Sequence, residues 1–173
     1  MNEPATAARW IDDTLGRLTL AQKIAQMITA EIAGGYVADD DPRLARWVRL
    51  AKDLGVGGLV VYGGTPRDVA RLVNRLQGEA DVPILISSDF EGGPGQQVSG
   101  ACEFPGDMAF AAVGDEDLMY RAAGVGAAEG RAMGIHLTYS PVADVTVGAA
   151  NPAESVRTFG ADVGTLGRMI RAY

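Results

Sequence analysis

The sequence has little cysteine and histidine and no long apolar run. Its one cysteine, Cys102, cannot form a disulfide within the chain and has no second thiol with which to bind a metal ion. No segment approaches the roughly 20 apolar residues that a membrane-spanning helix needs. Residues 1–9 carry neither a basic leader nor an apolar stretch of signal-peptide length. We therefore expect a cytoplasmic protein with no membrane partner, no metal site and no cofactor.

Clusters of positive charge are also absent. The chain contains 15 Lys and Arg residues against 22 Asp and Glu residues, and its formal net charge is −7. A nucleic-acid partner requires clustered cations that neutralise phosphates and release counterions, so we exclude this class of partner. The 173 residues, of which 47% are hydrophobic, suffice for one globular domain with a sizeable core.

Two kinds of apolar pattern alternate along the chain. Helical spacing is clearest at Leu44, Trp47, Val48 and Ala51, which would share one helix face. Short continuous apolar runs are typical of strands that are covered on both faces. Strands are predicted near Met27–Ala30, at Gly58–Tyr62, at Val82–Ser87 and at Ile135–Tyr139, and helices are predicted at Leu20–Gln26, Pro42–Gly55, Pro66–Leu76 and from Asp115 to Met133. Thr19, Thr65 and Asp115 are the predicted N-caps.

This alternation predicts an α/β fold with parallel strands. The pattern itself leaves two outcomes open, an open doubly wound sheet and a closed eight-stranded barrel. A complete barrel needs roughly 250 residues, so the units found here would make about half of one. The stretch Gly92–Gly114 is rich in Gly and Pro and is expected to be a loop excursion at the carboxyl end of a strand.

Carboxylates follow two of the predicted strands. Asp89 and Glu91 come after the strand that ends at Ser87, and they would share one face if the backbone stays extended. Such a pair can divide acid and base roles or accept hydrogen bonds from sugar hydroxyls, while loop capping is the structural alternative. Asp144 follows the last predicted strand. Arg157 offers a five-donor fork for carboxylates or vicinal hydroxyls, with a surface salt bridge as the alternative.

Several segments occur in an order that carries a family resemblance. They are Leu18–Met27, Asp89–Gly93, Phe104-Pro105, Ala128-Glu129 with Met133–Ile135, Pro141–Val145, Asn151-Pro152 and Arg157–Gly160. Together they resemble the N-terminal (β/α) barrel domain of glycoside hydrolase family three. The Glu-Gly-Gly form at Glu91 is more similar to the bacterial β-N-acetylhexosaminidase branch than to typical β-glucosidases.

The resemblance implies the N-terminal part of a TIM-type (β/α)8 barrel, with residues 1–173 forming a single incomplete domain. It also implies a retaining mechanism, in which an aspartate nucleophile forms a glycosyl-enzyme intermediate on a terminal β-linked N-acetylglucosaminide or β-glucoside. By resemblance, Asp89 holds hydroxyls of the terminal sugar and Arg157 reaches the same sugar. Glu91 and Asp144 are further candidates for substrate binding, and Gln97 stands where the family usually has an arginine.

The family's Lys-His block, with its nearby catalytic histidine, and its nucleophilic aspartate have no counterpart before Tyr173. We therefore predict that this chain supplies sugar-binding residues, contains no catalytic residue and is inactive alone. The sole histidine, His136, lies inside a predicted strand, where a structural role is expected.

Two alternatives remain beside the hydrolase. One is a non-catalytic sugar-binding or self-assembling half-barrel module, because unpaired strand edges favour homo-oligomers. The other is a nucleotide-binding sheet that uses Gly57-Gly58 or Gly92–Gly95 as phosphate loops. It is disfavoured because Gly57-Gly58 precedes its strand and neither run has the spacing of a phosphate loop.

Overall fold

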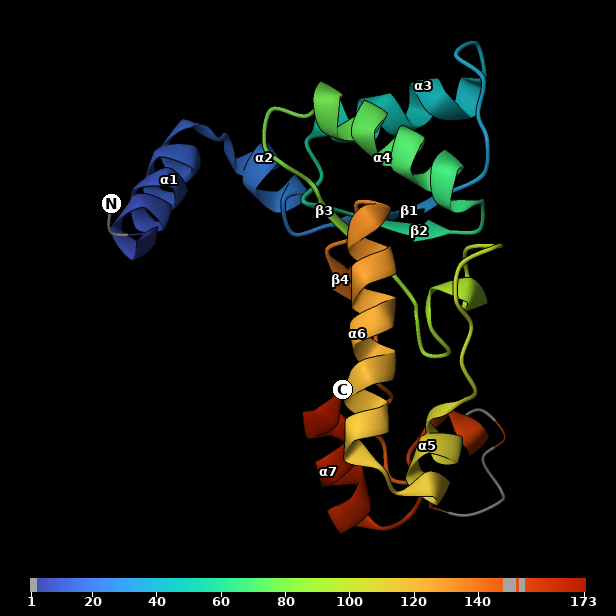
Figure 1. Cartoon of the computed structure of the whole chain (residues 1–173). Helices are drawn as coiled ribbons and strands as arrows, with labels where there is room; N and C mark the ends of the chain where they lie inside the picture. Colours follow the sequence, from blue (N-terminus) through green and yellow to red (C-terminus); the bar gives the residue numbers. More distant parts are fainter. Residues whose placement is uncertain (1–2, 148–151, 153–154) are drawn as a thin grey trace.

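The computed structural model describes residues 3–147, 152 and 155–173 (Figure 1). Its helices are α1 (Glu3–Arg17), α2 (Leu20–Ala25), α3 (Pro42–Arg49), α4 (Pro66–Glu79), α5 (Asp107–Val113), α6 (Glu116–Ala132) and α7 (Val163–Ala172). The π-helical turn η1 (Leu50–Leu54) continues α3, and η2 (Pro94–Gln96) and η3 (Ser155–Arg157) are short 3-10 turns. The strands are β1 (Thr29–Ala33), β2 (Gly58–Tyr62), β3 (Leu85–Ser88) and β4 (Leu137–Thr138).

The strands form one parallel sheet in the order β1-β2-β3-β4. Each strand lies beside the next one in the sequence, with α3 between β1 and β2 and α4 between β2 and β3. The predicted parallel α/β arrangement is therefore confirmed. Since parallel strands end at the same edge of a sheet, loops that are distant in sequence meet there.

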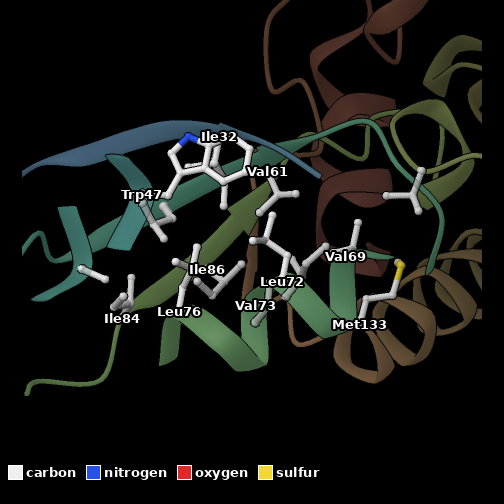
Figure 2. Packing of buried hydrophobic residues seen from close by; sticks show 14 of the residues in the cluster. Ile32, Trp47, Val61, Val69, Leu72, Val73, Leu76, Ile84, Ile86 and Met133 are labelled. Atoms are coloured by element: carbon white, nitrogen blue, oxygen red, sulfur yellow. The ribbon is translucent and has the colours of Figure 1, made fainter. Parts of the chain in front are cut away.

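Helices α3 and α4 lie side by side over one face of the sheet (Figure 1). Ile32, Val61 and Ile86 point from the strands toward these helices, where they meet Trp47 and Leu76 (Figure 2). Complete burial of one such side chain contributes roughly 1.5–3 kcal/mol, so this cluster fixes the register of the sheet. The neighbouring row across the strands, Glu31, Val60, Ser87 and Leu137, faces the opposite side.

Helix α6 extends away from the sheet, and α5 and α7 pack near its far end (Figure 1). They share a second apolar cluster made of Phe110, Met119, Phe159, Leu166 and Met169. Helices α1, α5 and α7 were not predicted. The stretch expected to be a loop, Gly92–Gly114, contains η2 and all of α5.

Helix starts agree with the local sequence signals. Thr19 forms a capping box with Gln22, whose side chain accepts a hydrogen bond from the Thr19 backbone N–H. Thr65 caps α4 ahead of Pro66, and Asp115 caps α6, both as predicted. These caps satisfy backbone donors that have no partner inside a helix.

Strand boundaries differ from the prediction where long-range contacts intervene. The first strand begins at Thr29 instead of Met27, because the Met27 and Ile28 N–H groups still bond to Ile24 and Ala25 in the turn after α2. The strand predicted from Val82 begins at Leu85, since the Gln77 amide binds both backbone groups of Ile84 at 2.7 and 3.0 Å.

The strand predicted at Ile135–Tyr139 is shorter, at Leu137–Thr138, and His136 precedes it. The Ile135 N–H bonds to the Gly130 carbonyl at the end of α6. The His136 ring, through Nδ1, accepts the hydrogen bond of the Ile86 N–H in place of a backbone carbonyl of a neighbouring strand. Within the described ranges, no helix is long and apolar enough to cross a membrane.

Candidate functional site

Polar side chains gather where β2, β3 and β4 end. Tyr62 ends β2, Asp89 directly follows β3, and Tyr139 directly follows β4. The Tyr139 hydroxyl lies 3.1 Å from the Ser87 hydroxyl, which joins the ends of β3 and β4. Burial raises the pKa of Tyr62, and the nearby charges of Asp89 and Glu31 raise it further. These groups therefore form one rim at the carboxyl edge of the sheet.

A bidentate ion pair crosses this rim. The Arg157 Nε and Nη2 atoms donate to Glu91 Oε2 and Oε1, both at 2.6 Å. The Glu91 side chain is 11% exposed and that of Arg157 is 51% exposed, so the carboxylate is the more buried partner of the pair. Two parallel charge-assisted bonds fix the guanidinium plane more firmly than a single contact does. The structure thus brings two predicted site residues together, although they are 66 positions apart.

Asp89 presents an unsatisfied acceptor beside this pair. Its Oδ1 atom is buried and has no hydrogen-bond partner among the described residues. Burial raises the pKa of Asp89, the charge of Glu91 raises it further, and the charge of Arg157 lowers it. A buried carboxylate oxygen without a donor is costly, and a ligand hydroxyl would satisfy it. Asp89 and Arg157 therefore act on each other electrostatically at a common rim.

Asp107, which we did not predict, lies behind the ion pair. It is the first residue of α5, is 1% exposed, and accepts a hydrogen bond from the Val142 backbone N–H. Its Oδ2 atom is buried without a hydrogen-bond partner in the described part of the chain. Burial raises its pKa to about 6, the Val142 hydrogen bond lowers it, and the charge of Glu91 raises it. In the sequence, an aspartate at a helix start carries no signal of burial.

Gln97 and Asp144 are not joined to this cluster. Gln97 ends η2, where its backbone N–H bonds to the Pro94 carbonyl at 3.1 Å, and Asp144 is exposed after the Val142 position. Over the residues described, no hydrogen bond or ion pair links either side chain to Asp89, Glu91 or Arg157, so their roles stay predictions. Asn151, part of the family resemblance, lies outside the described residues.

His136 is bound within the fold. Its Nδ1 atom accepts the Ile86 N–H at 3.0 Å, and its own backbone N–H donates to the Ile86 carbonyl at 2.8 Å. Burial lowers the pKa of His136, and the charge of Arg131 lowers it further. The neutral ring with an unprotonated Nδ1 is thus the form that binds the beginning of β3. Within residues 3–147 and 155–173 no His, Cys, Asp and Glu side chains are grouped to hold a metal ion.

An apolar cavity of about 170 Å³ lies beside the rim, lined by α6, by the segment that follows β3 and by residues 135–138, which lead into and form β4. Phe90, Phe104 and Phe110 are among the residues that line it, as are the carboxylates Glu91 and Asp107. The cavity therefore adjoins both carboxylates.

Comparison with known proteins gives consistent matches. The family model described as glycosyl hydrolase family 3 N terminal domain matches residues 19–173. A β-N-acetylglucosaminidase/β-glucosidase of Cellulomonas fimi is 36% identical over 95% of this chain and 28% of its own length. A periplasmic β-glucosidase/β-xylosidase of Dickeya chrysanthemi is 31% identical over 96% of this chain and 28% of its own length. This chain thus spans little more than a quarter of these relatives.

Comparison with solved structures gives matches to the same fold. A β-glucoside phosphorylase bound to 2FGlc superimposes with a TM-score of 0.85 at 27% identity, covering 95% of this chain and 29% of the other. A family 3 β-N-acetylglucosaminidase of Paenibacillus sp. strain FPU-7 superimposes with a TM-score of 0.77 at 33% identity, covering 90% and 31%. These matches confirm the predicted fold class, the N-terminal part of a parallel (β/α) barrel.

Proposed function

The chain belongs to glycosyl hydrolase family 3, and we propose that it forms the sugar-binding part of a retaining glycoside hydrolase. The proposed substrates carry a terminal β-linked N-acetylglucosamine or glucose. The names of the relatives support this class, because they combine N-acetylglucosaminidase, glucosidase and hexosaminidase activities.

The observation that carries the proposal is the arrangement of Asp89 beside the Glu91–Arg157 pair. Asp89 Oδ1 is buried without a partner within the described residues, so a sugar hydroxyl can donate to it. Arg157 is held flat by two bonds of 2.6 Å while about half of its side chain stays exposed. A guanidinium held in a fixed orientation beside a buried, unsatisfied acceptor suits a sugar ring, whose hydroxyls can both donate and accept hydrogen bonds.

In this proposal Glu91 orients Arg157, whereas the sequence predicted that it binds the substrate. Both of its oxygens receive hydrogen bonds from Arg157, so it orients the guanidinium and leaves direct sugar contacts to Asp89 and Arg157. The nucleophile and the general acid are assigned to the part of the relatives that this chain does not span. The chain alone is therefore expected to bind sugar without cleaving a glycoside.

The test combines binding and turnover. The 173-residue chain is titrated with N-acetylglucosamine and with glucose by NMR, and hydrolysis of the p-nitrophenyl β-glycosides of both sugars is assayed. Asp89→Asn should abolish saturable binding, whereas Asp81→Asn, an exposed aspartate before β3, is the matched control. Equal binding by wild-type protein and Asp89→Asn, or cleavage by the short chain, contradicts the proposal.

A full-length form, extended to match the relatives, should hydrolyse the same glycosides. Because one structural relative is named a phosphorylase, the assay is run with and without inorganic phosphate. Release of the free sugar in both conditions supports hydrolysis. A sugar phosphate formed only when phosphate is present would assign the reaction to phosphorolysis instead.

Self-association is the second candidate, and the open face of the sheet favours it. Leu85, Leu137 and Tyr139 are 48%, 38% and 51% exposed, and β1 and β4 are edge strands of the described sheet. Unpaired edges beside apolar side chains are a template for pairing between copies. Light scattering of the 173-residue chain should then show a mass that rises with concentration, while a concentration-independent monomer rejects this candidate.

A further inference from the structure

The residues on either side of Arg157 are held by the start of α5. Val142, which donates its N–H to Asp107, forms a parallel bridge with Thr158. At Gly106, the residue before Asp107, an added Cβ would lie 2.7 Å from the Val156 carbonyl oxygen. The start of α5 therefore packs directly on η3, and the backbone next to Arg157 cannot move independently of Asp107.

The ionised form of the Asp107 carboxyl is also disfavoured by its burial. In the part of the chain that the structure describes, Glu91, from the loop after β3, and Tyr173, from the end of α7, interact electrostatically with Asp107. Arg131 and His136 line the same cavity. Burial and the charge of Glu91 raise the pKa of Asp107 to about 6. Above that pH a second carboxylate lines the same cavity as Glu91, and the two like charges repel, although burial is the larger cause of the raised pKa.

We propose, on the basis of the sugar-binding function above, that Asp107 is a positioning residue for Arg157 whose proton controls the Glu91–Arg157 pair. When Asp107 is protonated, Glu91 is free of repulsion and holds the guanidinium fork in the orientation seen in the structure. When Asp107 is ionised, it repels Glu91 and loosens the fork. The sugar site is thus best formed in mildly acidic conditions.

The test reads the ion pair directly and does not depend on sugar. The Arg157 side-chain Nε–H, which donates to Glu91 at 2.6 Å, gives an NMR signal that is followed while the wild-type chain is titrated with acid. A chemical-shift transition with a midpoint near 6, the pKa of Asp107, is expected. Asp107→Asn should remove that transition and keep the low-pH shift throughout, because the amide remains neutral.

Two further variants separate charge from packing. Glu103→Gln removes one exposed charge from the same segment and should leave the transition unchanged. Gly106→Ala keeps the charge but presses on Val156, so the signal should shift or broaden at every pH. A transition that survives in Asp107→Asn, or one that is lost in Glu103→Gln, overturns the inference.

Binding of N-acetylglucosamine is measured on the same samples. At neutral pH, Asp107→Asn should bind more tightly than the wild type by a factor of up to about ten, and the two should converge at low pH. Asp89 titrates in both proteins, so their ratio at each pH isolates Asp107. Absence of sugar binding in both proteins counts against the proposed function, whereas the Arg157 signal still decides the role of Asp107.

Discussion

Replacement of Asp107 by asparagine should stabilise the protein at neutral pH and leave its stability nearly unchanged in acid. The pKa of Asp107 rises from an ordinary value of 3.8 to about 6 on folding, so the folded state binds the proton more tightly than the unfolded chain. Stability is therefore fully present below about pH 4 and is lost as the pH rises through 6. The lost free energy of unfolding is on the order of 3 kcal/mol, at about 1.36 kcal/mol for each pH unit.

Asparagine avoids this loss because it carries no charge. Its Oδ1 atom can still accept the Val142 N–H, so the contact at the start of α5 is kept. The full difference of about 3 kcal/mol is an upper value, since relaxation around the ionised carboxylate reduces the penalty. A gain of 1 kcal/mol or more would still shift the urea midpoint measurably.

The assay is urea unfolding at several pH values from about 4 to 8, followed by circular dichroism and by tryptophan fluorescence. Trp47 is buried and reports the sheet and α3, while agreement between the two probes tests for two-state unfolding. The difference between the variant and the wild type is used, so that other titrating groups cancel. A stability difference that is the same at every pH would refute the argument, as would a loss of stability near pH 7.

Two further predictions concern the sheet. His136→Ala should lower the free energy of unfolding by about 1–3 kcal/mol, because the buried Ile86 N–H loses its acceptor. The loss should be smaller in acid, where the wild-type His136 becomes protonated and no longer accepts this bond. Urea unfolding near pH 5 and pH 7.5 measures both effects. Gly57→Ala should prevent folding or strongly destabilise the protein, because an added Cβ would overlap the Gln26 carbonyl oxygen. Gly78→Ala in α4 meets open space and should stabilise the protein by about 0.5–1 kcal/mol in thermal unfolding. Equal thermal midpoints for these two glycine variants would contradict the packing at the start of β2.

Local signals allowed much of the fold to be predicted. Thr19, Thr65 and Asp115 cap helices through contacts within three residues, so the necessary information lies in short stretches of sequence. The run Gly58–Tyr62 is the strand as predicted, because a short buried parallel strand must be apolar on both faces. The order of strand and helix then required a parallel sheet.

Other features depend on partners that are distant in sequence. The start of β3 moves to Leu85 because the Gln77 side chain occupies the backbone of Ile84, and no propensity reports such a contact. Likewise, the burial of Asp107 arises from the packing of α5 on η3, which follows more than 40 residues later in the chain. Asp144, like Asp89, follows a predicted strand, yet it is exposed and joins no other site residue within the described part of the chain.

The site lies between two apolar clusters, so the geometry of its side chains depends on the packing of both. Phe90, beside Asp89 and Glu91, belongs to the cluster under the sheet, whereas Phe159, close to Arg157, belongs to the cluster of α5, α6 and α7. Each half of the Glu91–Arg157 pair is therefore anchored in a different core. The two bonds of the pair can form only when these cores hold their relative positions, which makes the start of α5 as important for the proposed sugar site as the strands themselves.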